Sequence, residues 1–263
     1  MGEVIVITSG KGGVGKTTTT ANIGTALAMM GKRTVLVDTD LGLRNLDVVM
    51  GLENRIVYHL VDVAEKRCRL HQAMIKDKKL ETLSLIPAAQ TRDKSAVSEG
   101  QMQKITSALK EEFDYVLIDC PAGIEQGFKN AVAGADRALV VTTPEISAVR
   151  DADRVIGLLE AAGLPEPQVI VNRVRFDMVR RGEMMNIEDI LDILAVELIG
   201  IVADDEDIVI STNRGEPIVK NQLSSSGKSF RNIARRINGE EVPFLHDHAG
   251  KTLWQRLTAM FAR

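Results

Sequence analysis

The chain has 263 residues, a formal net charge of −3 and only 3% aromatic residues. This length is enough for one large α/β domain or two small ones, and the small net charge excludes a global attraction to nucleic acid or anionic surfaces. No segment approaches the roughly 20 apolar residues that a membrane span needs, and two cysteines, Cys68 and Cys120, are typical of reduced thiols in a cytosolic protein.

Strand and helix patterns alternate along the chain. Runs of aliphatic residues predict buried strands at residues 4–8, 34–38, 83–86, 115–119, 138–142, 168–172 and 198–202. Helical spacing predicts helices at residues 17–30, about 99–112 and about 146–162. The alternation predicts an α/β fold with a doubly wound, mostly parallel sheet and helices on both faces. Ligands of such sheets bind at the carboxyl ends of the strands, so polar residues there are the candidates for a site.

A glycine-rich loop follows the first predicted strand so closely that we expect no signal peptide. It reads Gly10-Lys11-Gly12-Gly13-Val14-Gly15-Lys16-Thr17. A strand before it and a helix after it are the context that the phosphate loop of a nucleotide-binding protein requires. Its glycines let backbone N–H groups point at phosphate oxygens, and the helix N-terminus adds its positive end. We expect Lys16 to reach the β- and γ-phosphates of ATP and Thr17 to bind Mg²⁺ through its hydroxyl.

Acidic residues follow two of the other strands. Asp38 and Asp40 stand at the end of the second strand, where acids can hold Mg²⁺ through water or orient the attacking water. Asp119 follows four apolar residues, which is the Walker B arrangement, so we expect it to hold Mg²⁺ through a water molecule. Pro121 and Gly123 shape the next loop, which can respond to the γ-phosphate.

The loop sequence from Lys11 to Thr18 resembles the deviant Walker A motif of the MinD/ParA family of dimerising P-loop ATPases. Other segments are similar to the MinD branch of that family, so the resemblance covers nearly the whole chain. These are residues 42–47, 50–53, 72–77, 87–94 and 147–154. The resemblance implies a homodimer formed with ATP, in which Lys11 reaches the partner's nucleotide and stabilises charge during phosphoryl transfer.

The same resemblance assigns roles to residues outside the loop. Asp40 matches the acid that positions the attacking water, and we include it with Thr17 and Asp119 in the Mg²⁺ site. Asn172 and Arg173, at the end of a predicted strand, match the position that contacts adenine, where an amide can offer a donor and an acceptor together. After the last strand, family members often carry a Pro-Asp step, but this chain departs from the pattern with residues 203–205, Ala-Asp-Asp.

The composition changes near residue 238, so we predict an ATPase domain at residues 1–237, a linker at 238–250 and an amphipathic helix at 251–263. At about 100° per residue, the apolar side chains of that helix fall within an arc of roughly 120°, flanked by basic residues. The pattern is typical of an interfacial membrane helix, although a helix docked on the domain would show the same stripe. The residues expected at the membrane are Leu253, Trp254, Arg256, Leu257, Met260 and Phe261.

These patterns together predict a Mg²⁺-dependent ATP hydrolase that is cytoplasmic and binds the cytoplasmic face of the cell membrane peripherally. The family implies that it regulates bacterial cell division by recruiting a MinC-type inhibitor of the division ring to an anionic membrane surface. It also implies a MinE-type activator of hydrolysis.

Two other functions fit part of the same pattern. A ParA-type DNA-partitioning ATPase would share every nucleotide-binding residue, and arginines at positions 173, 175, 180 and 181 form a modest basic cluster. We nevertheless expect this cluster to belong to a loop beside the nucleotide, and we expect no specific nucleic acid partner. A scaffold that uses ATP only to assemble would not need Lys11, Lys16, Asp40 and Asp119, all of which are present.

Overall fold

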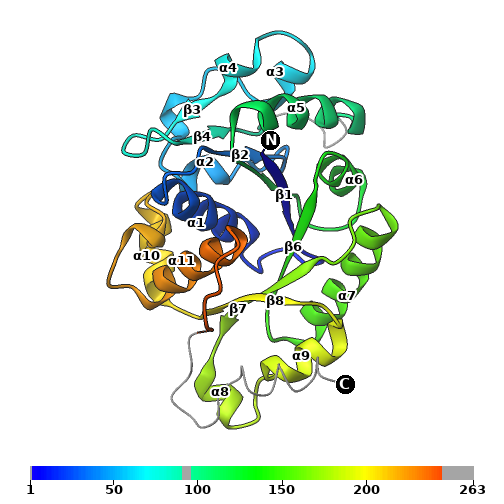
Figure 1. Cartoon of the computed structure of the whole chain (residues 1–263), viewed down its shortest axis with the longest axis vertical. Coiled ribbons are helices and arrows are strands. Elements are labelled where there is room, and N and C mark those ends of the chain that lie inside the picture. The colour runs from blue at the N-terminus through cyan, green and yellow to red at the C-terminus, as the bar shows by residue number, and fades with distance from the viewer. Residues whose placement is uncertain (1, 91–95, 245–263) are drawn as a thin grey trace.

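A sheet in the strand order β3-β4-β2-β5-β1-β6-β7-β8 forms the centre of the computed structural model, which describes residues 2–90 and 96–244 (Figure 1). The strands are β1 (Glu3–Thr8), β2 (Thr34–Asp38), β3 (Ile75–Lys76), β4 (Leu83–Ile86), β5 (Tyr115–Asp119), β6 (Arg137–Thr142), β7 (Gln168–Val174) and β8 (Leu198–Ala203). All neighbouring strands are parallel except β3, which pairs with β4 in the antiparallel direction at one edge. The doubly wound, mostly parallel sheet is therefore confirmed.

Helices cover both faces of this sheet (Figure 1). One face carries α3 (Leu60–Ala64), α4 (Leu70–Ala73), α5 (Glu99–Glu112), α6 (Gln126–Val132), α7 (Ile146–Ala161), α8 (Phe176–Arg180) and α9 (Ile187–Leu194). The other face carries α1 (Lys16–Met29), α2 (Leu46–Val49), α10 (Glu206–Asn213), the 3₁₀ turn η2 (Ile218–Lys220) and α11 (Ser225–Ile237). A further 3₁₀ turn, η1 (Glu53–Arg55), follows α2. The site loops at the strand ends thus emerge between two layers of helices.

Two hydrophobic clusters hold the layers together, one on each face of the sheet. Along β1, Val4 and Val6 belong to the first cluster, whereas Ile5 and Ile7 belong to the second. Successive side chains of a strand point to opposite faces, and here both faces are covered by helices. This is why the strands read as continuous apolar runs in the sequence rather than as alternating patterns.

The predicted strands and helices are confirmed with small differences at their ends, and one of these differences affects the site. β7 continues to Val174, so Asn172 and Arg173 lie inside the strand and not at its end as predicted. The pairing of β7 with β8 shifts register between Val171 and Val174, and Arg173 has a φ of 57°. This irregularity lets the strand continue past the point where its apolar run stops.

The chain beyond α11 falls in the predicted linker, and its first residues still contact the domain. Arg236 on α11 donates hydrogen bonds to the carbonyl oxygens of Val242 and Pro243. The predicted amphipathic helix at residues 251–263 lies outside the described residues, as does part of the 87–94 segment. Within residues 2–90 and 96–244, no helix is long and apolar enough to cross a membrane.

Close packing between β8 and α11 gives a test of this fold. A Cβ atom added at Gly200 would lie 2.3 Å from Cγ1 of Ile233, which is fully buried in α11. We expect Gly200→Ala to lower the free energy of unfolding by about 1–3 kcal/mol through overpacking. Gly157→Ala is the matched control, because Gly157 lies in α7 with nothing within 4 Å of its added Cβ, and it should stabilise by up to about 1 kcal/mol. Urea denaturation measures both, and equal effects would contradict the packing described here.

Candidate active site

The predicted site residues of β1, β2 and β5 meet at one edge of the sheet. Because β5 lies between β2 and β1, and all three strands are parallel, their carboxyl ends stand side by side. Asp38 and Asp119 occupy paired positions of β2 and β5. The glycine-rich loop leaves the end of β1 beside them and leads into α1. The sheet topology therefore brings together three segments that are far apart in the sequence.

The glycine-rich loop has a backbone that ordinary residues would not allow. Gly15, the residue that precedes α1, has a φ of 98°, and a Cβ atom there would lie 2.4 Å from Nδ2 of Asn172. A Cβ atom on Gly10 would lie 2.3 Å from the carbonyl oxygen of Asp151 in α7. No side chain caps the N-terminus of α1, so the amide groups of its first turn stay available to an anion. This geometry is suited to binding phosphate.

Lys16 and Thr17 begin α1 and lie close to Asp119. Lys16 is buried, and its positive charge favours the ionised form of Asp119. The hydroxyl groups of Thr17 and Thr20 both form hydrogen bonds to the Asp119 carboxyl group, and the Thr20 contact measures 3.2 Å. A carboxylate, a lysine and a threonine hydroxyl thus converge at the N-terminus of one helix.

Asp38 and Asp119 form a pair of buried carboxyl groups whose negative charges are only partly offset by the groups around them. Asp38 accepts hydrogen bonds from the backbone N–H groups of Asp40, at 2.9 Å, and Leu46, at 3.3 Å. Burial is the main cause that raises the pKa of both carboxyl groups, and the negative charge of Asp119 raises that of Asp38 further. The pKa of Asp38 lies well above its usual value, and that of Asp119 rises to about 6.

This charge deficit fits a bound divalent cation. Hard cations such as Mg²⁺ take oxygen ligands and keep several waters, with phosphate oxygens completing the shell. The Thr17 hydroxyl and the Asp119 carboxylate are suitable oxygen ligands at this position. No group of three or more His, Cys, Asp or Glu residues that suits a metal ion occurs in the described part of the chain. The oxygen groups of Thr17 and Asp119 fit Mg²⁺ bound together with a nucleotide.

Asp40 lies in the loop after β2, where hydrogen bonds of the backbone hold it beside Asp38 and Asp119. Its N–H group donates to Asp38, and its negative charge contributes to raising the pKa of Asp119. Thr39 fixes this loop on β5, because both its N–H group and its hydroxyl bond the Asp119 carbonyl oxygen, at 3.1 and 2.7 Å. The loop therefore holds Asp40 close to Asp38 and Asp119.

Lys11 points away from this centre within the single chain. Its Nζ atom lies 3.1 Å from the Ser147 hydroxyl and 3.7 Å from a carboxylate oxygen of Glu145, at the start of α7. The lysine side chain is 45% exposed. Lys11 is thus held at the rim of the loop, where a second molecule can approach it.

Asn172 supports the glycine-rich loop from β7. Its Nδ2 group donates a hydrogen bond of 2.8 Å to the carbonyl oxygen of Val14, while its buried Oδ1 atom has no hydrogen-bond partner among the described residues. An unpaired buried acceptor is costly and marks a place where a ligand can donate. Arg173 is exposed and points away from the strand's buried face. After β8, Asp205 caps α10 by accepting the N–H of Asp207.

Four residues of this site were not predicted from the sequence. Thr20 lies one helical turn after Lys16, so helical spacing carries a signal for its place on the same face. Thr39 stands between the two predicted acids. Glu145 and Ser147 lie 134 and 136 positions after Lys11, and no local pattern links them to it.

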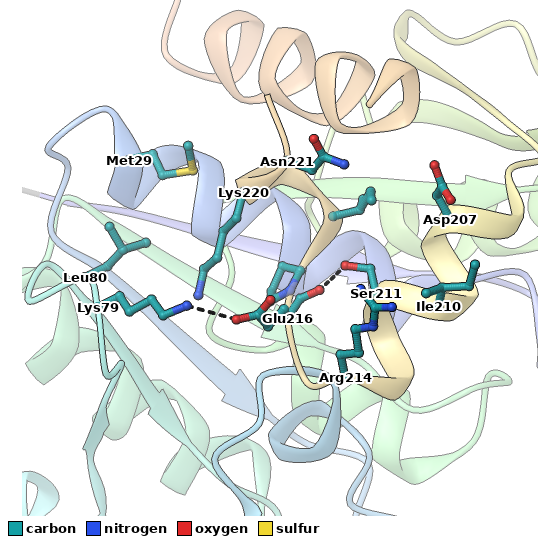
Figure 2. Close-up of a pocket in the computed structure, with 12 residues that line it drawn as sticks. Met29, Lys79, Leu80, Asp207, Ile210, Ser211, Arg214, Glu216, Lys220 and Asn221 are labelled. Atoms are coloured by element: carbon teal, nitrogen blue, oxygen red, sulfur yellow. Dashed lines mark hydrogen bonds and ion pairs between the residues drawn. The ribbon is translucent and has the colours of Figure 1, made fainter. Parts of the chain in front are cut away.

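A groove of about 510 Å³ lies elsewhere on the molecule, between α10, η2 and the turn that joins β3 to β4 (Figure 2). Lys79 reaches across it to Glu216, at 2.9 Å. Both side chains are more than half exposed, so this ion pair contributes little to stability. None of the predicted site residues is among the described residues that line the groove. This groove is therefore separate from the phosphate-binding loop.

Comparisons with known proteins agree with the geometry. The sequence model of a family described as "ParA: NUBPL iron-transfer P-loop NTPase" matches residues 1–238. Septum site-determining protein MinD of Bacillus subtilis (strain 168) is 62% identical over 245 residues, which are 92% of this chain and 91% of that protein.

Two solved structures are also similar. The MinC:MinD cell division protein complex of Aquifex aeolicus has a TM-score of 0.88 at 50% identity, covering 93% of this chain and 98% of that chain. The septum site-determining protein MinD of Pyrococcus horikoshii OT3, complexed with Mg-ADP, has a TM-score of 0.83 at 32% identity, covering 90% of this chain and 96% of that chain.

The raised pKa of Asp119 gives a stability test. Asp119 binds its proton more tightly in the folded chain, with a pKa of about 6, than in the unfolded chain, where the value is near 3.8. The nucleotide-free domain therefore loses stability as pH rises from about 4 to about 6. Asp119→Asn keeps the shape of the group and removes its charge, so it should stabilise the nucleotide-free chain at pH 8 by on the order of 1 kcal/mol or more.

The gain should fade as pH falls below about 6, because the parent carboxyl group is then neutral as well. Thermal unfolding without nucleotide, followed between pH 5 and pH 8, measures it. Asp153→Asn, which removes an exposed acid from α7, is the control and should change little. A variant at Asp119 that is less stable than the parent at pH 8 would contradict the charge deficit.

Proposed function

Since the chain belongs to the MinD family of P-loop ATPases, we propose that it is a division-site ATPase that hydrolyses ATP with Mg²⁺ and recruits a MinC-type inhibitor of the division ring. The observation that carries this proposal is the convergence of Lys16, Thr17 and Asp119 beside the phosphate-binding loop. The relative from Aquifex aeolicus has been solved as a complex of MinC with MinD, which supports the choice of partner.

Different groups of the loop bind different parts of the triphosphate. Backbone N–H groups from Gly10 to Thr18 bind phosphate oxygens, and Lys16 offsets the charge of the β- and γ-phosphates. Thr17, Asp119 and Asp40 would hold Mg²⁺, and the ion would supply positive charge that offsets the charge of the phosphates. Asp40 also orients the water that attacks the γ-phosphate.

The adenine contacts come from β7. Asn172 has one amide group committed to the Val14 carbonyl oxygen, and its Oδ1 atom stays available as an acceptor. The exocyclic amino group of adenine can donate to that oxygen. Arg173 stands next to it on the exposed side of the strand. Asn172 would therefore contact the adenine base and the phosphate loop at the same time.

Dimerisation with ATP would complete the catalytic centre. In the single chain Lys11 rests on Ser147 and Glu145, and such exposed contacts are worth little. They can be exchanged for contacts with the phosphates of a partner's ATP, which carry much more charge. A lysine delivered by a second subunit would act as an arginine finger does. ATP is then bound by one chain and hydrolysed by two.

Membrane binding is assigned to the C-terminal segment. We divide the chain into an ATPase domain at residues 1–237, a linker at 238–250 and a membrane-binding helix at 251–263. One such helix binds anionic lipid weakly and reversibly, and two in one dimer raise the avidity. The protein thus associates peripherally with the cytoplasmic face of the membrane while ATP holds the dimer. A MinE-type activator would end this state by stimulating hydrolysis.

The DNA-partitioning alternative is less supported. Members of the arginine cluster near α8 form ion pairs with acids: Arg181 pairs with Asp177 at 3.2 Å and with Glu183 at 2.8 Å, and Arg175 approaches Asp177 at 4.0 Å. These acids reduce the attraction of the cluster for the DNA backbone. The relatives of high identity carry the MinD name.

Sedimentation with vesicles tests the membrane assignment. The full chain with ATP and Mg²⁺ should sediment with vesicles that contain anionic phospholipid, and the chain lacking residues 251–263 should not. Lys16→Ala, which cannot use ATP to dimerise, should bind these vesicles about 10²-fold more weakly, because only one tail engages at a time. If Lys16→Ala sediments as well as the parent does, the paired-tail mechanism is wrong. Tight, salt-sensitive DNA binding without lipid binding would favour the partitioning alternative.

Turnover measurements test the role of Lys11. With vesicles present, Lys11→Ala should lose on the order of 10³-fold in the ATPase rate. Its single-chain affinity for ATP should change only a few-fold, because Lys11 lies at the exposed rim of the loop. Lys79→Ala, which removes an exposed lysine from the groove of Figure 2, should retain the parent's rate. A Lys11→Ala protein with parent turnover would exclude catalysis across the dimer.

A further inference from the structure

The chain that follows α11 is held against the sheet by one arginine. The guanidinium group of Arg236 donates to the carbonyl oxygens of Val242 at 2.9 Å, Pro243 at 3.0 Å and Ile199 at 2.9 Å. The ring of Phe244 lies with its centroid 4.0 Å from Cζ of the same guanidinium. Arg236 therefore links residues 242–244 to β8. Its guanidinium N–H groups bond three carbonyl oxygens, and one of its faces lies against the Phe244 ring.

The local backbone makes this return of the chain possible. Gly239 has a φ of 85°, and its N–H group donates to the Arg236 carbonyl oxygen, so α11 ends in a tight left-handed turn. Arg235 then pairs with Glu240 at 2.7 Å, and Tyr115 contacts Asn238 at 3.3 Å. These contacts direct the next residues back along the domain.

The turn carries the chain from one face of the sheet to the other. α11 packs on the hydrophobic cluster that also holds α1, whereas Phe244 packs against the cluster under α5, α7 and α9. Strand β8 ends the sheet among the described strands, and the Ile199 carbonyl oxygen that Arg236 bonds belongs to it. Arg236 thus also covers part of a sheet edge.

The partly buried charge of Arg236 has an energetic cost that an apolar side chain at this position would not have. Burial lowers the pKa of the Arg236 guanidinium to about 10, so removing it from water is unfavourable. Three carbonyl acceptors and an aromatic face offset this cost. All of these contacts of the guanidinium are with Ile199 and with residues 242–244. Their effect is to fix the position at which the chain leaves the domain.

We propose that Arg236 is a positioning residue for membrane binding, which anchors the chain at Phe244 and so shortens the linker to the C-terminal helix. This proposal rests on the proposed function, in which residues 251–263 bind the membrane. The contacts of residues 238–240 do not depend on the Arg236 side chain, so without the anchor the free linker would comprise the ten residues 241–250, and with it only the six residues 245–250. Their maximal reach is about 35 Å and about 20 Å respectively.

A shorter linker strengthens the second of two linked binding events. The effective concentration of a linked site falls roughly as the −3/2 power of linker length. Reducing ten residues to six therefore raises it about twofold. In an ATP-bound dimer the anchor would act on both tails and favour the state in which both are on the membrane.

Vesicle sedimentation of the full chain with ATP and Mg²⁺ tests the anchor. Arg236→Gln should weaken binding to vesicles of anionic phospholipid about twofold, while ATP hydrolysis without lipid stays at the parent's rate. Phe244→Ala should have a smaller effect in the same direction, because the bonds of Arg236 to Val242 and Pro243 remain. Lys228→Gln is the matched control, since it removes an exposed positive charge from the same helix and should bind as the parent does.

Compensation separates an effect on linker length from general destabilisation. Deleting residues 245–250 from the Arg236→Gln chain restores a short linker and should restore binding. Replacing the same residues by six Gly and Ser residues keeps the length and should not restore it. The proposal is wrong if Arg236→Gln binds as tightly as the parent, or if the deletion fails to rescue it.

The chain lacking residues 251–263 shows which idea has failed. If this truncated chain sediments as well as the parent, the tail is not the membrane-binding element and the proposed function fails. If it does not sediment while Arg236→Gln binds as the parent does, membrane binding by the tail stands and only the anchoring role of Arg236 is wrong.

Discussion

Two buried carboxyl groups, Asp38 and Asp119, set the main constraint on this protein. Parallel pairing of β2 with β5 places them at matching positions, and the helices on both faces exclude water from them. Like charges in such a place are tolerated only when donors and positive charge surround them. Lys16, two threonine hydroxyls and backbone N–H groups meet part of this need, while burial still raises the pKa of both carboxyl groups.

This deficit connects stability with function. A cation bound beside the loop would offset the repulsion between these two carboxyl groups. Active sites commonly carry such a cost, which the rest of the structure sustains. Here the rest is a parallel sheet whose two large hydrophobic clusters lie on either side of the strands that present the acids. A rigid core keeps the carboxyl groups from moving apart.

The phosphate loop is also held from outside the helix it begins. Asn172 supports it from β7, and the Lys11 side chain links it to the start of α7. One support uses a buried amide and the other an exposed lysine. The first suits a permanent contact, while the second is weak enough to exchange for a partner's phosphates. At the edge strand β8, Arg236 fixes the segment after α11 by donating hydrogen bonds from its charged group to backbone carbonyl oxygens.

Much of the fold and part of the site were encoded in consecutive residues. The buried strands were predictable because a sheet covered on both faces needs unbroken apolar runs. The phosphate loop was predictable because eight adjacent residues carry its geometry. Asp38 and Asp119 were predictable because each stands where an apolar run ends. Short helices such as α8 and α10 escaped prediction, since a few residues give too little periodicity to detect.

Tertiary structure alone decided the long-range contacts. Asn172 meets Val14 across 158 positions, and Lys11 meets Ser147 across 136. These pairs depend on strand order and on which loops share an edge, and local spacing contains neither. β7 likewise runs past Asn172 because its register with β8 shifts, a property of the pair and not of one strand. The sequence by itself determined that a phosphate loop and two strand-end acids exist, because these are local patterns. The folded sheet determined that they share one buried, charge-deficient centre, because only packing brings distant strand ends together.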